Sequence, residues 1–449
     1  MRVLHYSLGF PPYRTGGMTK FCMDLMMRQA GQGCEVALLW PGRMGIASKR
    51  ISVKDRGPVT VARGVPGIRS FELINPLPVS YDEGISRFSE FMKDGGNEAY
   101  AKLLEEYGPD VIHIHTLMGV HRSFLAEAAK KGIRIVFTAH DFFPVCPKIT
   151  LFRHGSVCAD AQSCRECGTC NVTALGIGKI RVLQSPAYRM LKDSALVRKI
   201  RKKHRDGYLG GDIPQSRAEP VGKPEDFKRL REYYHGFLRQ MDRIHFNSTV
   251  TRDAYEEFFD LPQSVVIGIT HGDIKDRRKI RHFPDTGLRI RYLGSCGAGK
   301  GFFLLREALD GLWGERRFCL DLHFAPAQMR PYFRVHERYT YDGLEAVFDE
   351  TDVLVVPSVW KETFGYTALE ALSFGVPVII SGTVGARDVL APGAGIVIED
   401  ITAEKLKDVL RSLDADRLRE MNRAIVERQV ILTLDEMAER IGRECYGWR

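Results

Sequence analysis

The feature that most constrains the fold is an alternation of strand-like and helix-like segments that occurs in two separate parts of the chain. In the first 140 residues, apolar runs such as RVLHYS, EVALLW and VIHIH alternate with segments of helical apolar spacing, such as MTKFCMDLMMRQAG. The alternation starts again near residue 286, where the strand-like runs are LRIRYLG, RFCLDLHF, DVLVVPS and VPVIIS. Such alternation predicts βαβ units and parallel sheets that helices cover on both faces. The sequence therefore predicts an α/β protein with two doubly wound, Rossmann-like domains.

The expected domain boundaries follow from where this alternation breaks. A chain of 449 residues is too long for a single core, so two domains are the default expectation. We expect an N-terminal domain over residues 1–270 and a C-terminal domain over residues 286–430, joined by the charged, turn-rich stretch HGDIKDRRKIRHFPDTG. Residues 141–235 interrupt the first domain as an insertion with a cysteine cluster, a basic run and a Gly/Pro-rich stretch. A ligand is expected in the crevice between the domains, at the carboxyl ends of both sheets.

The net charge of +9 is concentrated in one segment of the insertion. Residues 179–205 contain ten Lys or Arg and one acidic residue, Asp193, so the rest of the chain is formally neutral. This distribution argues against nucleic acid as a partner. Apolar and basic residues recur in the segment at roughly helical spacing, which is typical of helices that bind anionic membrane surfaces, although Pro186 interrupts the pattern. The alternative is a charged helix that is solvated or packed on the domain.

The sequence gives no sign of a membrane span or a secretory leader. No apolar stretch approaches the roughly 20 residues that cross a bilayer, and the apolar run after Arg2 is too short for a signal peptide. Five of the ten cysteines are scattered, mostly among apolar residues, as expected of small core residues in a reducing compartment. We expect a cytoplasmic protein, whose basic segment would allow peripheral binding to the inner face of the cell membrane.

The other five cysteines lie together in the insertion. The stretch VCADAQSCRECGTC contains Cys158, Cys164, Cys167 and Cys170, and Cys146 lies upstream. Two overlapping Cys-x2-Cys steps in a polar loop can point thiolates at one ion, and thiolates suit zinc or an iron–sulfur cluster. We expect a structural zinc site formed by Cys158, Cys164, Cys167 and Cys170, with Cys146 as an alternative ligand. An iron–sulfur cluster is the second choice. Free or disulfide-bonded thiols are the remaining alternative.

Two carboxylates stand eight positions apart in PSVWKETFGYTALE. Glu362 falls in the turn after a buried strand, where ligands of α/β proteins collect, and Glu370 lies about two helical turns further on. Between them, the amides of Phe364 and Gly365 would lie at a helix start, where unpaired N–H groups bind phosphate. One acid could then hydrogen-bond a sugar and the other a ribose. The alternative is a capped surface helix with two solvated acids.

These residues also carry a resemblance to a known family. PSVWKETFGYTALEALSFGVPVIIS is similar to the E-x7-E segment of retaining GT-B glycosyltransferases of glycosyltransferase family 4, and in particular of the polysaccharide-biosynthesis type. PPYRTGGMTKF, PDVIHIHT, VFTAHDFF, FNSTVTRDAY and YLGSCGAGKGF occur in the order that the family uses; the resemblance excludes the detailed course of residues 147–235. The resemblance implies a GT-B fold, in which two Rossmann-like domains face a cleft. It also implies that residues 431–449 form a C-terminal helix that crosses back to the N-terminal domain.

The resemblance implies roles for individual residues. Glu362 would hold the hydroxyls of the donor sugar, and Glu370 the ribose diol. Gly16 and Gly17, in the first βα loop, would let the backbone approach the donor phosphates or the acceptor. His115, the second histidine of VIHIH, would stand beside the donor sugar, and its alternative is a packed imidazole at a strand end.

Two further histidines of these strands have different expected roles. His140, in the stretch TAHD, is the rival candidate for the position beside the sugar. His113, the first histidine of VIHIH, is expected to point to the other face of its strand, into the core.

At the donor diphosphate the sequence departs from the family pattern. The family has Gly-Arg, a short loop and Lys-Gly, with both cations on the diphosphate. In GSCGAGKG, Lys300 is in place but Ser295 stands where Arg is usual. One cation fewer means less stabilisation of the leaving diphosphate. Either Ser295 and the amides of Gly297 and Gly299 supply that stabilisation, or another basic residue does, or donor binding is weaker.

The sequence therefore predicts a retaining glycosyltransferase that moves a sugar from a UDP- or GDP-sugar to a saccharide or a lipid-linked saccharide, in bacterial-type polysaccharide or glycoconjugate synthesis. Glu362, Lys300 and His115 are the expected catalytic residues. No catalytic metal is expected, because the one candidate metal-diphosphate triplet, Asp414–Asp416, lies in a helical run. The alternative is a catalytically weak GT-B subunit that binds glycan or a partner glycosyltransferase, which Ser295 and the large insertion favour.

Overall fold

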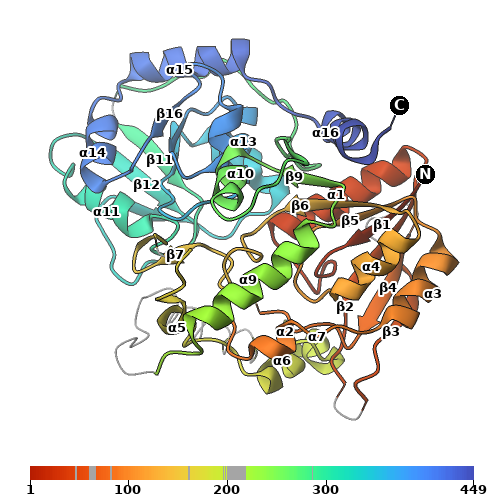
Figure 1. Ribbon diagram of the computed structural model, residues 1–449. Helices are drawn as coiled ribbons and strands as arrows, with labels where there is room; N and C mark the ends of the chain where they lie inside the picture. The colour runs from red at the N-terminus through yellow and green to blue at the C-terminus, as the bar shows by residue number, and fades with distance from the viewer. Residues whose placement is uncertain are drawn as a thin grey trace.

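The computed structural model contains two α/β lobes, each built around its own sheet (Figure 1). It describes residues 1–45, 48–59, 67–80, 83–159, 162–195, 197, 199, 219–285 and 287–448. We call the lobe that contains the first sheet the N-terminal lobe and the other the C-terminal lobe.

The sheet of the N-terminal lobe has the strand order β10-β9-β6-β5-β1-β2-β4-β3. Its strands are β1 Arg2–Tyr6, β2 Glu35–Pro41, β3 Ser52–Val59, β4 Ile68–Ile74, β5 Val111–Ile114, β6 Arg134–Ala139, β9 Arg243–Phe246 and β10 Ser264–Val266. Neighbouring strands are parallel except β3, which pairs antiparallel with β4 at the edge. The central strands are apolar because both of their faces are buried, whereas β3, with the sequence SVKDRGPV, is largely exposed.

Helices cover both faces of this sheet. They are α1 Gly17–Gly31, α2 Phe88–Phe91, α3 Asn97–Tyr107, α4 Arg122–Lys130, α9 Pro224–Leu238 and α10 Thr249–Glu256. On one face, residues of α3, α4 and α9 form a core with Leu4 and Ile112. On the other face, residues of α1 pack on Val3 and Val111. Side chains alternate along each strand, so successive residues of β1 and β5 enter these two cores in turn.

Among its described residues, the predicted insertion contains short elements before α9. They are β7 Phe152–Arg153, β8 Ser156–Val157, α5 Cys167–Cys170, α6 Ile177–Leu183 and α7 Pro186–Leu191. The helix α9 buries Phe227, Leu230 and Phe237 in the core of the lobe and leads into β9. The last part of the predicted insertion, from Pro224 onward, therefore forms a regular helix of the lobe. Part of the basic run, residues 196, 198 and 200–205, lies outside the described residues.

The sheet of the C-terminal lobe is parallel throughout, with the order β13-β12-β11-β14-β15-β16. Its strands are β11 Leu288–Tyr292, β12 Phe318–Leu322, β13 Phe333–Val335, β14 Val353–Val356, β15 Val378–Ser381 and β16 Gly395–Ile398. Its helices are α11 Phe302–Asp310, α12 Leu344–Asp349, α13 Tyr366–Ser373, α14 Ala403–Arg411 and α15 Ala415–Arg428, together with the one-turn helices η2 Tyr341–Gly343 and η3 Gly385–Val389. Fully buried apolar residues of β14 and β15 lie at its centre.

After α15 the chain returns to the N-terminal lobe, where both termini lie (Figure 1). The returning segment consists of α16 Leu434–Ile441 and the π-helical turn η4 Gly442–Tyr446. Met437, Ile441 and Cys445 are buried against Phe21 and Leu25 of α1. The segment therefore completes the cover of the sheet face that carries α1. Among the described residues, no helix combines the length and the apolar composition that spanning a membrane requires.

Candidate functional site

The central contact of the site joins two loops of the C-terminal lobe. Nζ of Lys300, in the loop between β11 and α11, lies 2.5 Å from Oε1 of Glu362, in the loop between β14 and α13. Ser358 donates a hydrogen bond from Oγ to the other carboxylate oxygen of Glu362, at 2.6 Å. Both loops follow strands of a parallel sheet at their carboxyl ends, where ligands of this fold class bind.

Glycines let these two loops pack directly on each other. The carbonyl of Gly299 accepts hydrogen bonds from the amides of Val359 and Trp360, at 2.9 and 3.2 Å. A Cβ at Gly299 would lie 2.5 Å from the Trp360 ring, and one at Gly301 would collide with the backbone of Pro357. The close approach sets Lys300 Nζ 5.4 Å from the centre of the Trp360 ring.

The pairing keeps Glu362 ionised. Burial acts to raise the pKa of this carboxyl group, but the charge of Lys300 and the hydrogen bonds from Lys300 and Ser358 outweigh it, and the pKa lies below its ordinary value. Lys300 and Glu362 are both half-buried. The pair thus presents a cation and a carboxylate side by side, and either group could instead bind an incoming ligand.

The start of α13 lies next to this pair. Gly365 has φ +98°, a conformation that favours glycine, and a Cβ there would lie 2.9 Å from Val384. Among the described residues, the amides of Phe364 and Gly365 form no hydrogen bond, although the Phe364 side chain is buried. The helix start therefore offers N–H groups and the positive end of the helix dipole, as a phosphate would require.

The second acid of the pair lies in a different environment. Glu370 is buried in the second turn of α13, and its Oε1 lies 3.0 Å from Nε2 of His271, which has no exposed surface. Tyr339 and Tyr341 lie nearby: burial, and then the charge of Glu370, raise the pKa values of both hydroxyls. In this arrangement the carboxylate of Glu370 contacts His271, and a ribose diol would replace or share that contact.

The first βα loop of the N-terminal lobe reaches the same helix. Gly16 has φ +115°, which requires glycine, and it precedes α1. A Cβ at Gly17 would lie 3.4 Å from the ring of Tyr366, the first residue of α13. The two glycines expected to approach a donor or an acceptor thus lie across the lobe boundary from the helix that carries Glu370.

A second contact across the boundary involves the loop of Glu362. Thr363 donates a hydrogen bond from Oγ1 to the backbone carbonyl of His140, at 3.3 Å. Ser248 and Thr251, at the start of α10, donate hydrogen bonds to the carbonyl of Thr363, at 2.6 and 3.0 Å. These contacts hold the end of β6, where His140 lies, next to the residue that follows Glu362.

The histidines lie differently from the sequence expectation. His115 has no exposed surface, and both of its ring nitrogens are used, by His5 at 2.9 Å and by His140 at 3.3 Å. His140 is half-buried, so it is the histidine that a substrate at the lobe boundary could reach. The expectation that His113 points away from His115 is wrong. Residues two apart on a strand share a face, and the two rings lie 4.2 Å apart.

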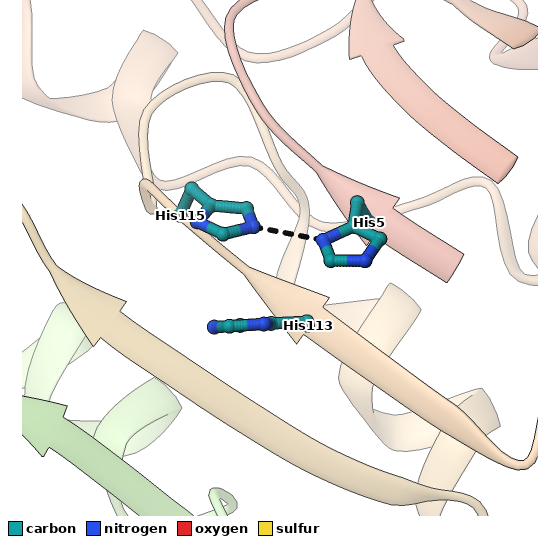
Figure 2. A group of neighbouring side chains, drawn as sticks. All are labelled: His5, His113 and His115. Carbon is teal, nitrogen blue, oxygen red and sulfur yellow. Dashed lines mark hydrogen bonds between the residues drawn. The ribbon is translucent and has the colours of Figure 1, made fainter. Parts of the chain in front are cut away.

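Three buried histidines come close enough together to suggest a metal site. Figure 2 shows His5 and His115 joined by a hydrogen bond, with His113 beside them, and one ring nitrogen of each lies within 4.8 Å of the others. Every ring nitrogen of the three already has a hydrogen-bond partner. A metal ion would have to break these bonds in a site without exposed surface, so the group is better explained as a hydrogen-bonded cluster.

The cysteines of the insertion gather around one small pocket. Four cysteines line this pocket: Cys146, Cys158, Cys167 and Cys170. Cys164 is buried beside them, and Arg231 lies 3.3 Å from its Sγ. Among the described residues, no three of these thiols lie within 4.8 Å of one another. The zinc site stays a prediction.

Ser295 stands at the expected diphosphate position, in the same loop as Lys300. Ser295 is exposed, and its carbonyl accepts a hydrogen bond from the hydroxyl of Tyr292, at 2.7 Å. Lys300 is therefore the cation that the structure places beside Glu362. Sequence reasoning missed Ser358, Trp360 and His271 as partners of the site. The first two stand in the stretch PSVWKE, four and two positions before Glu362, but nothing local indicated His271.

Solved structures share this architecture over the full length of the chain. Sucrose-phosphate synthase from Thermosynechococcus elongatus superposes with a TM-score of 0.57 at 15% identity, covering 98% of this chain and 97% of that one. HepE from Anabaena, solved in complex with UDP-glucose, gives 0.53 at 12% identity, covering 99% and 100%. At such low identity the likeness shows the fold, which is GT-B.

Two family models match the two halves of the chain. The model described as glycosyl transferases group 1 matches residues 273–429, and the model of glycosyltransferase family 4 matches residues 15–157. The chain is a member of the GT-B glycosyltransferases. Within this group, WaaG, a glycosyltransferase involved in lipopolysaccharide biosynthesis, superposes with a TM-score of 0.50 at 13% identity, covering 99% of this chain and 98% of that one. The group 1 match contains Lys300, Glu362 and Glu370.

One curated relative matches a short part of this GT-B chain. An uncharacterized 41.2 kDa protein in the cps region of Klebsiella pneumoniae is 39% identical over 70 residues, which is 15% of this chain. The matched part spans about a fifth of that relative, 19% of its length.

Proposed function

We propose that the protein transfers a sugar from a nucleotide-sugar donor to a saccharide or lipid-linked saccharide, with retention at the anomeric carbon. The observation that carries the proposal is the Lys300–Glu362 pair, 2.5 Å apart, beside the start of α13, where the amides of Phe364 and Gly365 form no hydrogen bond to any described residue. A cation and helix-start amides stabilise a departing diphosphate, and a carboxylate beside them can bind sugar hydroxyls. The donor in this proposal is a UDP- or GDP-sugar. HepE was solved with UDP-glucose, which supports the first choice.

His140 takes the position beside the donor sugar in this proposal, because His115 is fully buried. The backbone carbonyl of His140 accepts a hydrogen bond from Thr363, next to Glu362, and its half-buried ring would lie beside the donor sugar in this proposal. Among the described residues, no carboxylate other than Glu362 contacts Lys300. A reaction in which departure and attack occur on the same face of the sugar needs no enzymic nucleophile, and it fits this arrangement.

The acceptor side of the proposal includes an anionic membrane surface. Val182, Met190 and Leu191 on α6 and α7 are 60%, 81% and 57% exposed, next to basic residues of the same helices. Nζ of Lys192 donates a hydrogen bond to the carbonyl of Tyr13, at 3.1 Å. Tyr13 lies in the loop that leads to Gly16, so docking of α6 and α7 on lipid would bring a lipid-linked acceptor to that loop.

The second candidate function, a catalytically weak subunit that binds glycan or a partner enzyme, is favoured by one observation. Ser295 is exposed at the position where the family carries Arg, which leaves Lys300 as the cation beside Glu362. Thermal-shift measurements with nucleoside diphosphates and their sugars separate the two functions. Stabilisation by a nucleoside diphosphate, followed by product of retained configuration in NMR, supports the transferase. No stabilisation by any of these ligands favours the subunit.

A further inference from the structure

Five histidines of the N-terminal lobe are joined into one continuous line of hydrogen bonds. The line crosses the neighbouring strands β1, β5, β6 and β9 on the sheet face that α1 and the C-terminal segment cover. We call it the histidine chain. Its members, in order, are His140, His115, His5, Gln29, Tyr446, His113, Thr138, His245 and the carbonyl group of Ile267.

One end of the histidine chain sets the direction of its hydrogen bonds. The carbonyl oxygen of Ile267 can only accept, so Nε2 of His245 donates to it, at 2.7 Å. In a neutral imidazole the other nitrogen then accepts. Nδ1 of His245 therefore accepts from the hydroxyl of Thr138, at 2.9 Å. That hydroxyl oxygen in turn accepts from Nε2 of His113, at 2.6 Å.

Tyr446 and Gln29 fix the donor and acceptor roles in the other half of the histidine chain. Because Nε2 of His113 carries the proton, its Nδ1 accepts from the hydroxyl of Tyr446, at 2.6 Å. The Tyr446 oxygen accepts from Nε2 of Gln29, at 3.0 Å. This bond orients the Gln29 amide so that its Oε1 accepts from Nε2 of His5, at 2.8 Å.

The same order of donors and acceptors fixes the tautomer of His140, the histidine of the proposed site. Nδ1 of His5 accepts from Nε2 of His115, at 2.9 Å, so Nδ1 of His115 accepts from Nε2 of His140, at 3.3 Å. His140 therefore carries its proton on Nε2. Its Nδ1 forms no hydrogen bond to any described residue, and it remains as an acceptor for a ligand.

The histidines stay neutral, as this derivation requires. Burial lowers the pKa of His5 and of His245 to about 4 and that of His140 to about 3, and it holds those of His113 and His115 well below the ordinary value. At neutral pH each ring therefore has one donor and one acceptor nitrogen.

We propose that Tyr446, in the C-terminal segment, is a positioning residue that fixes the tautomer of His140 and so presents Nδ1 of His140 to a hydroxyl group of the donor sugar. The inference rests on the proposed function only in placing a donor sugar at His140. It assigns the segment that returns to the N-terminal lobe a role in the site, although Tyr446 itself is buried and does not touch a substrate.

The reason is that Tyr446 links His140 to the carbonyl of Ile267. With Tyr446 in place, exchanging donor and acceptor in every hydrogen bond of the histidine chain would point the lone pair of His245 Nε2 at that carbonyl oxygen, which is unfavourable. Without the Tyr446 hydroxyl, the Gln29 amide can turn over and donate to His5, and His5, His115 and His140 can then all move their protons to Nδ1. His140 would become a mixture of tautomers.

The test uses Tyr446→Phe in the full-length protein, with Tyr100→Phe as the matched control. Tyr100 is also fully buried and its hydroxyl lies 2.7 Å from Nδ1 of a histidine, His121, that is outside the histidine chain. Heteronuclear NMR of isotope-labelled histidine distinguishes the two tautomers, and His140→Gln identifies the signals of His140. We expect the Nε2–H form in wild type and in Tyr100→Phe, and a mixture in Tyr446→Phe.

A folded Tyr446→Phe protein with wild-type His140 signals would overturn the proposal. Gln29→Met breaks the line on the other side of Tyr446 and decides the question if Tyr446→Phe does not fold. A stoichiometric metal ion that wild type holds and His5→Gln loses would also overturn it, because the three clustered histidines would then be ligands.

The NMR readout needs no substrate, so its result is independent of the proposed function. If the tautomer of His140 depends on Tyr446 but the protein has no transferase activity, the proposed function is contradicted and the role of Tyr446 is not. In an active protein, we expect Tyr446→Phe to lower kcat about tenfold and leave the donor KM within about twofold, whereas Tyr100→Phe leaves both unchanged.

Discussion

The ammonium group of Lys300 lies 2.5 Å from the carboxylate of Glu362, although the two residues are 62 positions apart in the chain. Each residue stands in a loop at the carboxyl end of a parallel strand, and Gly299 and Gly301 let the loops touch. In this contact the positive charge of Lys300 compensates the negative charge of Glu362, which keeps that carboxyl group ionised. A donor diphosphate would compete with Glu362 for Lys300 and leave the carboxylate to the sugar hydroxyls.

The two acids are expected to have different roles. Glu362→Ala should lower turnover more than nucleotide affinity, because its carboxylate faces Lys300 and the sugar. Glu370→Ala should weaken nucleotide binding more than turnover, and it should also lower the free energy of unfolding by about 1–3 kcal/mol, because buried His271 loses its partner. Steady-state kinetics, calorimetric titration of nucleoside diphosphate and urea unfolding measure these quantities. Equal effects of both variants on turnover and affinity would contradict the division of roles.

The buried histidines predict a pH dependence of stability. Their pKa values are lowered in the folded protein, to about 4 for His5, so between pH ~6.5 and ~4 the unfolded chain binds more protons. Stability should therefore fall as pH falls through this range, by about 1.4 kcal/mol per pH unit for each such histidine. The free energy of unfolding, measured with urea at several pH values, should fall less steeply with falling pH in His5→Gln than in wild type. The exposed control His282→Gln should leave this pH dependence unchanged. A wild-type midpoint independent of pH would contradict this.

The cysteine pocket predicts bound zinc. Protein purified without oxygen should contain about one zinc per chain by elemental analysis. Removal of the zinc should loosen the insertion, whose described residues before α9 form only short elements. Cys158→Ser should lose the metal, whereas Cys34→Ser, which lies outside the pocket, should keep it. Iron in place of zinc would support the second choice, and a protein with neither metal would refute the site.

The exposed apolar residues of α6 and α7 predict binding to anionic vesicles. Wild type should float with liposomes that contain anionic lipid and not with neutral ones. The double variant Met190→Ser, Leu191→Ser should bind at least about tenfold more weakly, because it loses two exposed side chains that would enter the lipid. Met329→Ser, which removes a 56% exposed methionine from the other lobe, is the control. Binding that ignores lipid charge would argue against the surface.

Much of the fold could be predicted because the pattern that specifies it is local. Strands such as DVLVVPS and VPVIIS are apolar throughout and end in turns, and the loop of Glu362 follows one of them. The edge strand β3 and its neighbour β4 were not foreseen; β3 mixes charged residues, glycine and proline. The position of Lys300 beside Glu362 agrees with the expectation that both belong to one site.

The histidine cluster could be predicted only in part, because its contacts join distant segments. His5 meets His115 across 110 positions and Tyr446 meets His113 across 333, so no local signal relates them. The misplacement of His113 was avoidable, since the two-residue period of a strand puts it on the face of His115. The choice of His115 over His140 depended on burial, which becomes visible only when α1 and the C-terminal segment cover the sheet.

The most direct test of the account is release of nucleoside diphosphate from UDP- and GDP-sugars by wild type, Lys300→Met and Lys361→Met. Lys361 is the matched control, because it also pairs with a glutamate, Glu257, at 2.7 Å, close to the site in the sequence. We predict release by wild type and by Lys361→Met, and a fall of about a hundredfold or more in Lys300→Met. Equal release by Lys300→Met and wild type, or none by wild type with any of these donors, would contradict the account.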